Sequence, residues 1–297
     1  PDKILLSMVA VLAGNLPRTL MKASDLFSLQ GKTVLLTGAS GFLGSEMARS
    51  LVENDAKVIL FGRSEKLEAL KTELANEFGE AQVDGYTVDM YDTDVLKNTL
   101  GEAVAKTGTV DVLVNNAHEM GPGCGFNQPG AALETAPLEH FNNNLSGGMT
   151  GPVLAMQAVF PGMKEKGNGS IINTCTMYSI VAPDPALYRG TDKMNPAGYG
   201  SAKAALMQLT RYAASFWGEH GIRVNAIHPG PFANTEGTGA NAVDPNAPFL
   251  KVLNDKTCLG RTGVPRELIG ALLLLSSDAG SYITGQGISV DGGWTVR

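Results

Sequence analysis

Residues 33–53 read T-V-L-L-T-G-A-S-G-F-L-G-S-E-M-A-R-S-L-V-E, and this stretch decides the fold class. Thr33–Thr37 is a short apolar run of the kind found in buried parallel strands. Glycines follow at once, and Phe42–Glu53 then carries helical spacing. A glycine turn in this position lets the backbone approach a pyrophosphate, which the free N–H groups of the helix start can bind. The alternative is a plain strand–helix turn, but the order strand, glycines, helix favours a dinucleotide site.

Strands and helices alternate along the rest of the chain. We predict further strands at residues 57–61, 86–88, 110–114, 170–175, 223–227 and 288–290. We predict helices at residues 65–78, 92–106, 138–166, 197–220 and 265–276, with Asp92 as an N-cap. Repeated strand–helix units imply an α/β fold, a Rossmann-type doubly wound parallel sheet of about seven strands with helices on both faces. No linker or internal repeat divides the pattern, so we expect one domain over residues 21–297.

Composition excludes several classes of protein. The chain has 297 residues and a net charge of −6, which gives nucleic-acid binding no electrostatic support. Its three cysteines, Cys124, Cys175 and Cys258, are widely spaced and include no CxxC pair. Neither a disulfide framework nor a metal site is therefore expected, and a cytoplasmic location fits best.

The first residues form an apolar run, Ile4–Gly14, that is too short to span a membrane. This run resembles the apolar region of a signal peptide, with Ala13 near a cleavage point. We favour the alternative that residues 1–20 are an N-terminal extension outside the core and that Met21 is the natural start. No membrane association is expected.

Tyr199 and Lys203 are four residues apart in a predicted helix, so they share one face. A free tyrosine has a pKa of about 10 and is a poor base at neutral pH. A nearby ammonium stabilises the phenolate and lowers that pKa. The pair is therefore suited to general acid–base chemistry, although a tyrosine and a lysine at this spacing are also common on surfaces.

Together these motifs resemble those of the short-chain dehydrogenase/reductase family over roughly residues 26–297. The motifs that carry the resemblance, in order, are Thr37–Gly44, Asn115-Asn116-Ala117, Asn144-Leu145, Tyr199–Lys203, Pro229-Gly230 and Asp291–Trp294. The opening Asp25–Lys32 is similar to that of gluconate 5-dehydrogenases. The resemblance implies an NAD(P)-dependent oxidoreductase that acts on CH–OH groups of a sugar acid or polyol.

The resemblance also implies roles for individual residues. Tyr199 would be the catalytic acid/base, Lys203 would lower its pKa and hold the nicotinamide ribose, and Asn144 would hold a water in a proton relay. Thr176 stands where the family places a substrate-orienting serine, with Ser179 as the alternative hydroxyl. The implied cofactor-binding residues are Gly38, Ser40, Gly41, Phe42, Leu43, Gly44, Arg63, Asp89, Asn115, Ala117, Tyr199, Lys203, Pro229 and Gly230.

The end of the second strand bears on the choice of cofactor. Gly62 stands where many dinucleotide folds place a carboxylate that accepts the ribose hydroxyls of NAD. Arg63 follows and can pair with the 2′-phosphate of NADP, so we expect NADP rather than NAD. The alternative is a solvated surface arginine.

Three departures from the family pattern stand out. Phe42 replaces a middle glycine, His118 replaces the glycine expected after Asn115-Asn116-Ala117, and Thr176 replaces the serine. His118 is a candidate for lining the active site, with a packed or solvent-facing histidine as the alternative. The departures keep open a catalytically weakened relative, such as a dinucleotide-binding sensor or scaffold.

Three irregular stretches, residues 118–129, 181–196 and 231–255, are candidates for the substrate side, unless they are variable surface loops. The candidate contacts are His118, Tyr178, Arg189 and Lys193. Arginine binds carboxylates in a fork, so we expect a small, hydroxylated, anionic substrate. A 3-oxoacyl-carrier reductase is the rival enzyme, but its acidic carrier would favour a basic patch. A homotetramer or homodimer is the assembly that the family implies.

Overall fold

The computed structural model describes residues 22–128, 130–191, 194–235 and 243–297, so Lys193 and the predicted 1–20 extension lie outside the described residues. Its strands are β1 (Thr33–Thr37), β2 (Lys57–Gly62), β3 (Val83–Thr87), β4 (Val112–Asn115), β5 (Gly169–Thr174), β6 (Ile222–Pro229) and β7 (Gly287–Val290). They form one parallel sheet in the order β3-β2-β1-β4-β5-β6-β7. The order reverses between β1 and β4, as in a doubly wound fold, and the predicted fold class is confirmed.

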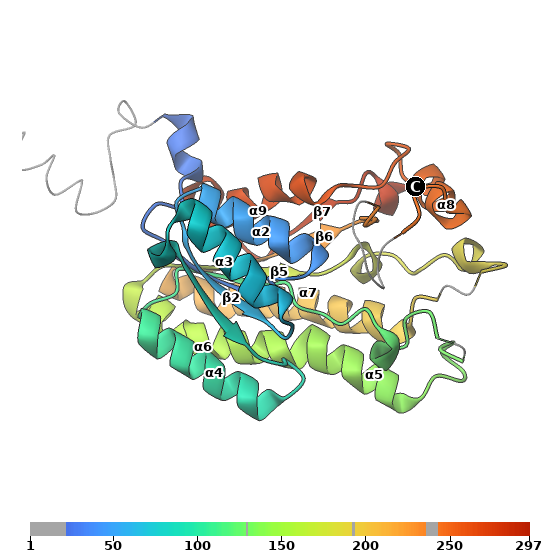
Figure 1. The fold of residues 1–297 in the computed structure, drawn as a ribbon, viewed down its shortest axis with the longest axis horizontal. Coiled ribbons are helices and arrows are strands. Elements are labelled where there is room, and N and C mark those ends of the chain that lie inside the picture. The colour runs from blue at the N-terminus through green and yellow to red at the C-terminus, as the bar shows by residue number, and fades with distance from the viewer. Residues whose placement is uncertain (1–21, 129, 192–193, 236–242) are drawn as a thin grey trace, which may run out of the picture.

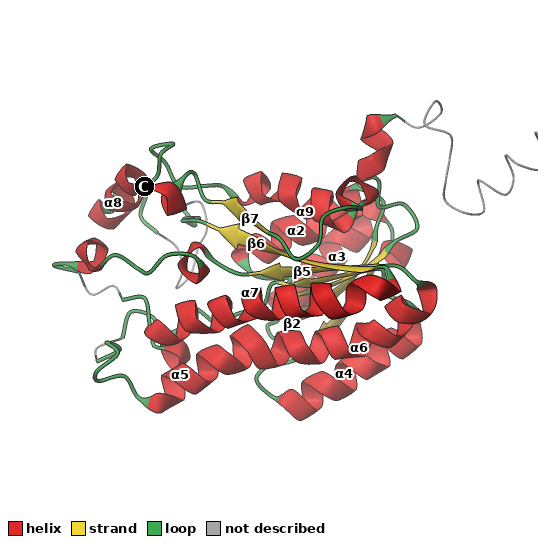
Figure 2. Cartoon of the chain, turned by 180° about the vertical axis from the view of Figure 1, so that it is seen from behind, coloured by secondary structure: helices red, strands yellow, loops and turns green. Residues whose placement is uncertain are grey.

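Helices cover both faces of the sheet (Figure 1). On one side lie α2 (Phe42–Glu53), α3 (Lys66–Phe78) and α9 (Ile269–Ser276). On the other side lie α4 (Thr93–Thr107), α5 (Leu138–Leu145), α6 (Gly151–Lys166) and α7 (Ala197–Trp217), while α8 (Pro248–Lys256) sits at one end. Figure 2 shows from behind that β6 and β7 run toward that end.

Two hydrophobic cores fill the space between the sheet and its helices. Alternate residues of one strand serve opposite cores: Leu36 packs with α2 and α9, and its neighbour Leu35 packs with α4 and α6. Both leucines are fully buried. Strands buried on both faces read as continuous apolar runs, which is why Thr33–Thr37 was recognisable in the sequence.

Two predicted elements differ from the structure. The third strand begins at Val83 rather than Tyr86, because it pairs with β2 along residues 83–87 despite its Asp84-Gly85 pair. The predicted helix at 138–166 is divided into α5, a π-helical turn at Ser146–Thr150, and α6. Close packing accompanies this turn, since a Cβ on Gly147 would lie 2.4 Å from the Tyr91 hydroxyl.

Candidate active site

The glycine turn leaves β1 and enters α2 with little spare room. A Cβ on Gly44 would lie 2.0 Å from the Gly38 oxygen, and one on Gly38 would lie 2.7 Å from the Cα of Ala117. Gly38 also has a positive φ of 66°, which favours glycine. Gly41 caps α2 without a side-chain hydrogen bond, so the first-turn amides remain available as donors. The turn therefore fits a pyrophosphate, and Ser40, Phe42 and Leu43 lie in it as predicted.

Two buried polar bridges fix the turn to the neighbouring strands. The Thr37 hydroxyl accepts hydrogen bonds from the amides of Asn116 and Ala117, both at 3.1 Å. The Asn115 amide donates to Asn173 at 2.9 Å. The Asn173 amide in turn donates to the Thr210 hydroxyl on α7 at 2.8 Å. The end of β4 is thus tied both to the dinucleotide turn and to the helix of Tyr199.

Charged residues follow the carboxyl ends of β2 and β4. Arg63, which is half-exposed, donates to the Glu119 carboxylate at 2.9 Å. This hydrogen bond raises the pKa of Arg63, against an opposing effect of burial. Asp89 accepts a hydrogen bond from the Tyr91 amide at 3.0 Å and faces Arg63 electrostatically. Arg63 therefore differs from a solvated surface arginine, because it is paired with Glu119 and lies near Asp89.

Tyr199, Lys203 and Thr176 come together in a buried group. The two α7 side chains are 8% and 2% exposed, and Thr176 is 5% exposed. Burial raises the pKa of the Tyr199 phenol to about 12, while a hydrogen bond with Thr176 lowers it in part. The ammonium of Lys203 donates to the Thr174 oxygen at 2.8 Å, and burial lowers its pKa to about 8.

The direction of the Tyr199 pKa corrects the sequence-based expectation. Proximity of Lys203 predicted a lowered pKa, but desolvation of the phenolate is the larger effect in this structure. Since burial also disfavours the charged lysine, the two side chains share one apolar environment. Stabilising a phenolate there requires further polar groups beside them.

Thr176 rather than Ser179 is placed beside the phenol. The Ser179 hydroxyl lies 2.7 Å from the His228 Nδ1 and also donates to the Thr176 carbonyl. It is therefore occupied by other partners, whereas the Thr176 side chain hydrogen-bonds Tyr199. The geometry favours the first of the two candidate hydroxyls.

Asn144 is engaged by protein groups. Its amide donates to the carbonyls of Cys124 and His140 at 2.8 and 2.7 Å, and its oxygen contacts the His118 Nε2 at 3.1 Å. Because that oxygen can only accept, the Nε2 of His118 must carry the proton. Each polar atom of the Asn144 side chain thus has a protein partner, and its oxygen keeps a second lone pair that can accept a hydrogen bond from the predicted water.

His118, a candidate for lining the active site, is packed beside Tyr199. Its ring centroid is 4.9 Å from that of Tyr199, and burial lowers its pKa to about 3. It is therefore neutral at physiological pH. Its Nδ1 is buried without a hydrogen-bond partner in the described part of the chain.

Aromatic side chains pack around the Tyr199 phenol. Phe126 contacts the Tyr199 ring edge-on at a centroid distance of 5.1 Å. The hydroxyl of Tyr178 lies 3.3 Å from that of Tyr188, and its ring meets Trp294 at 6.3 Å. These residues belong to one buried cluster that also includes Met177 and Leu187. Tyr178, a candidate substrate contact, therefore lies in the same cluster as Tyr199.

The segment after β5 places its candidate anchors differently. Arg189 is exposed and electrostatically affects Asp184, which forms an ion pair with Lys256 of α8. Lys193 lies outside the described residues. At the end of β6, the Gly230 amide donates to the Val290 oxygen at 3.0 Å. The preceding residue, Pro229, is buried and pairs with Val290 of β7.

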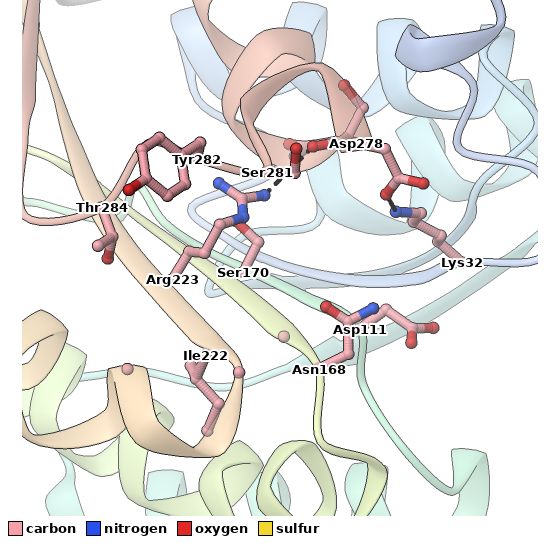
Figure 3. A pocket seen from close by; sticks show the side chains of 15 residues that line it. Lys32, Asp111, Asn168, Ser170, Ile222, Arg223, Asp278, Ser281, Tyr282 and Thr284 are labelled. Atoms are coloured by element: carbon pink, nitrogen blue, oxygen red, sulfur yellow. Dashed lines mark hydrogen bonds and ion pairs between the residues drawn. The ribbon is translucent and has the colours of Figure 1, made fainter. Parts of the chain in front are cut away.

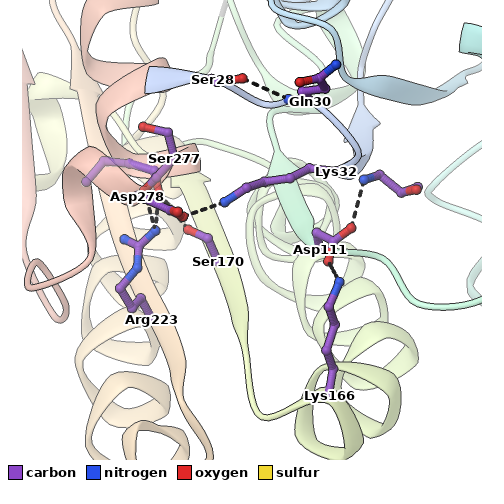
Figure 4. Close-up of polar contacts among 11 residues, drawn as sticks. Ser28, Gln30, Lys32, Asp111, Lys166, Ser170, Arg223, Ser277 and Asp278 are labelled. Atoms are coloured by element: carbon purple, nitrogen blue, oxygen red, sulfur yellow. Dashed lines mark hydrogen bonds and ion pairs between the residues drawn. The ribbon is translucent and has the colours of Figure 1, made fainter. Parts of the chain in front are cut away.

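A separate cavity of about 440 Å³ lies at the opposite, amino-terminal edge of the sheet (Figure 3). Arg223 extends along its wall and donates to the carbonyls of Leu275, Ser277 and Ile283. Lys32 pairs with Asp278 at 2.7 Å, and Asp111 pairs with Lys166 (Figure 4). These charged groups pair with one another and with main-chain carbonyls, while the hydroxyls of Ser276 and Ser277 in the cavity lining are buried without a hydrogen-bond partner among the described residues.

Sequence reasoning missed Glu119, Phe126 and Trp294 as parts of the site. Glu119 follows β4 at the same sheet edge as Arg63, and this position was the available signal. Trp294 was recognised only as part of a family motif. In the part of the chain that the structure describes, no cluster of metal ligands and no helix able to cross a membrane occur.

Comparisons with known proteins agree with this geometry. A family model described as enoyl-(acyl carrier protein) reductase matches residues 38–295. Gluconate 5-dehydrogenase from Gluconobacter oxydans is 33% identical over 93% of this chain and 99% of its own length. A sorbose reductase from Candida albicans is 30% identical over 91% of this chain and 89% of its own.

The chain belongs to the short-chain dehydrogenase/reductase family. It is an NAD(P)-dependent oxidoreductase that acts on CH–OH groups. A solved gluconate 5-dehydrogenase from Burkholderia cenocepacia, in complex with NADP and tartrate, is 29% identical with a TM-score of 0.79. That match covers 93% of this chain and all of the other. The predicted family, and its likeness to gluconate 5-dehydrogenases, are confirmed.

Proposed function

We propose that this short-chain dehydrogenase/reductase interconverts a secondary alcohol and a ketone on a small sugar acid or polyol. The observation that best supports this proposal is that Tyr199, Lys203 and Thr176 are buried together beside the glycine turn. The curated relatives named above act on gluconate and sorbose, which supports this substrate class.

Each residue would have a definite task. Tyr199 would give or take the hydroxyl proton, and Thr176 would hold the substrate oxygen beside it. Lys203, anchored on Thr174, would hold the ribose and supply positive charge near the phenol. The bound nicotinamide would supply or accept the hydride. His118 would brace the Tyr199 ring through its bond to Asn144.

The dinucleotide would be NADP, held by the amides of the glycine turn and by Arg63. The solved relative in complex with NADP supports this assignment. The 2′-phosphate carries up to about two negative charges and matches a guanidinium fork. An NAD enzyme of this fold would more typically offer a carboxylate in place of Gly62.

The substrate would bind beside the aromatic cluster, to which the 181–196 segment contributes Leu187 and Tyr188. The hydroxyls of Tyr178 and Tyr188 would bind a hydroxylated substrate, and exposed Arg189 would attract a carboxylate. An acidic carrier protein would favour a basic patch on this chain, and the net charge of −6 gives no support for one. We therefore prefer sugar acids to carrier-linked acyl groups.

A substrate screen tests this proposal. Purified protein is incubated with sugar acids, neutral polyols and apolar ketones, each with both dinucleotides, and the absorbance of the reduced nicotinamide is followed. Turnover is expected to be best with a sugar acid or polyol and NADP. Best turnover on an apolar ketone, with Arg189→Ala leaving KM unchanged, would contradict the substrate class.

We also propose that residues 21–297 form one domain that assembles into a homodimer or homotetramer in the cytoplasm. On α7, Tyr212 and Phe216 stack with centroids 4.4 Å apart although both are more than half exposed. An exposed aromatic pair favours burial against another surface. Light scattering of the parent protein and of Tyr212→Glu tests the assembly, which this change should weaken.

A further inference from the structure

The ion pair between Arg63 and Glu119 crosses the dinucleotide turn. Arg63 follows β2, Glu119 lies beyond the end of β4, and β1 with its glycine turn lies between those two strands in the sheet. Neighbouring strands are about 4.8 Å apart, so the two side chains together reach across roughly two strand spacings to form the ion pair. The two side chains therefore meet above the place where the turn would hold the pyrophosphate and ribose.

The two partners are held unequally. The backbone amide of Glu119 donates to the Tyr91 hydroxyl at 3.2 Å, and a Cβ on Gly121 would lie only 2.9 Å from its carboxylate. The side chain of Glu119 is 23% exposed, whereas that of Arg63 is 52% exposed. The glutamate is thus packed on its own loop, and the arginine is the freer partner.

The charge around Arg63 is unfavourable to a further anion. Two carboxylates, those of Glu119 and Asp89, face this one guanidinium. A 2′-phosphate that binds Arg63 must displace the Glu119 contact and then remain near two negative side chains. A nucleotide without that phosphate has no anion to place against the Arg63 guanidinium.

We propose that Glu119 competes with the 2′-phosphate for Arg63 and thereby limits how strongly the protein prefers NADP over NAD. This inference rests on the proposed function, in which Arg63 receives the 2′-phosphate. Glu119 is thus a specificity-determining residue outside the glycine turn and outside the end of β2. Its carboxylate lowers the affinity for nucleotides that carry a 2′-phosphate and leaves the affinity for those without one unchanged.

The test is direct binding of two nucleotides that differ only in the 2′-phosphate. Isothermal titration calorimetry compares adenosine 2′,5′-bisphosphate with adenosine 5′-monophosphate on the whole chain. We expect Glu119→Gln to raise the affinity ratio in favour of the bisphosphate by about three- to tenfold, since an exposed ion pair contributes up to about 1 kcal/mol and repulsion adds to it. Glu119→Asp, which keeps the charge but shortens the reach, should raise the ratio less.

Two controls make the result specific. Glu65→Gln removes an exposed carboxylate two residues from Arg63 that is not among the partners described for this arginine. It should change the ratio by less than Glu119→Gln does. In an Arg63→Ala background, Glu119→Gln should lose most of its effect, because coupled residues are not additive.

Each other outcome overturns the inference. An unchanged or lowered ratio in Glu119→Gln, an equal rise in Glu65→Gln, or a full effect without Arg63 would show that Glu119 does not compete for this cation. Failure of the parent protein to bind either nucleotide would instead overturn the proposed dinucleotide site. The two failures are therefore distinguishable.

Discussion

The amino and carboxyl edges of the sheet use their polar groups differently. At the amino edge, Arg223 donates to three main-chain carbonyls, and Asp111 accepts from Lys166 and from the Thr33 amide. At the carboxyl edge, Tyr199 and Lys203 are buried together and their pKa values are displaced in opposite directions. Paired polar groups stabilise the fold at the amino edge, whereas displaced pKa values are common at functional sites and support the acid–base role proposed for the carboxyl edge.

The largest expected effect tests the carboxyl edge. Tyr199→Phe removes the proton donor and keeps the ring that packs on His118 and Phe126. Turnover should fall by about 10²–10⁴-fold, the usual contribution of general acid–base catalysis. Nucleotide affinity, followed by fluorescence titration, should remain nearly unchanged. Turnover within about threefold of the parent would contradict the assignment.

A second change on the same edge separates the two hydroxyls. Thr176→Ala should lower kcat by about 10²-fold, because a donor beside the reacting oxygen is lost. Thr176→Ser should retain most activity. Ser179→Ala serves as the comparison, since its hydroxyl contacts His228 and the Thr176 carbonyl instead. Steady-state kinetics in which Ser179→Ala is the more damaging change would reverse the two roles.

The pH dependence of stability reports on Lys203. Burial lowers its pKa from 10.5 to about 8, so between these values the unfolded chain binds more protons than the folded one. Stability conferred by this residue must therefore rise with pH in that window. Relative to Lys203→Met, the free energy of unfolding of the parent should grow by about 2 kcal/mol between pH 8 and pH 10.

Urea denaturation at several pH values measures this difference. Tyr199 does not contribute to this pH dependence below about pH 10. Its pKa is raised in the folded state, so it affects stability only above the pKa of a tyrosine in the unfolded chain, which is about 10. A difference between the two proteins that stays constant with pH would mean that Lys203 is hydrated rather than buried.

The smallest expected effect tests the amino edge. Arg223→Ala removes hydrogen bonds to the last turn of α9 and to the segment before β7, and should cost about 2 kcal/mol of stability. Nucleotide affinity and KM should not change, because this edge lies opposite the proposed dinucleotide and catalytic residues. Thermal melting measures the loss of stability, and titration measures nucleotide affinity. A changed KM under conditions where the variant is fully folded would show that the two edges are coupled.

The fold was largely predictable because its signals are local. The apolar runs of β1 and β2, the glycine turn and the Asp92 cap each act over a few residues, and the Asp92 carboxylate indeed accepts from the Val95 amide. The start of β3 was not predictable, because Val83-Asp84-Gly85 has a low intrinsic strand preference and is held by pairing with β2.

The candidate site was predictable only in part. Motifs pointed to Tyr199, Lys203, Thr176 and the glycine turn, which the structure brings to one edge of the sheet. The pairing of Arg63 with Glu119 joins residues 56 positions apart and depends on strand order. The raised pKa of Tyr199 depends on burial, which no residue spacing reveals.

The buried bridge from Asn115 through Asn173 to Thr210 has a practical consequence for redesign. It joins β4, β5 and α7 without using any residue of the 181–196 or 231–255 segments. This bridge therefore holds the ends of β4 and β5 against α7 independently of those two segments, although Leu187 and Phe249 from them pack in the cluster around Tyr199. Loops of relatives with other substrates can be grafted onto this frame with the aim of changing what is oxidised while preserving how the proton is moved.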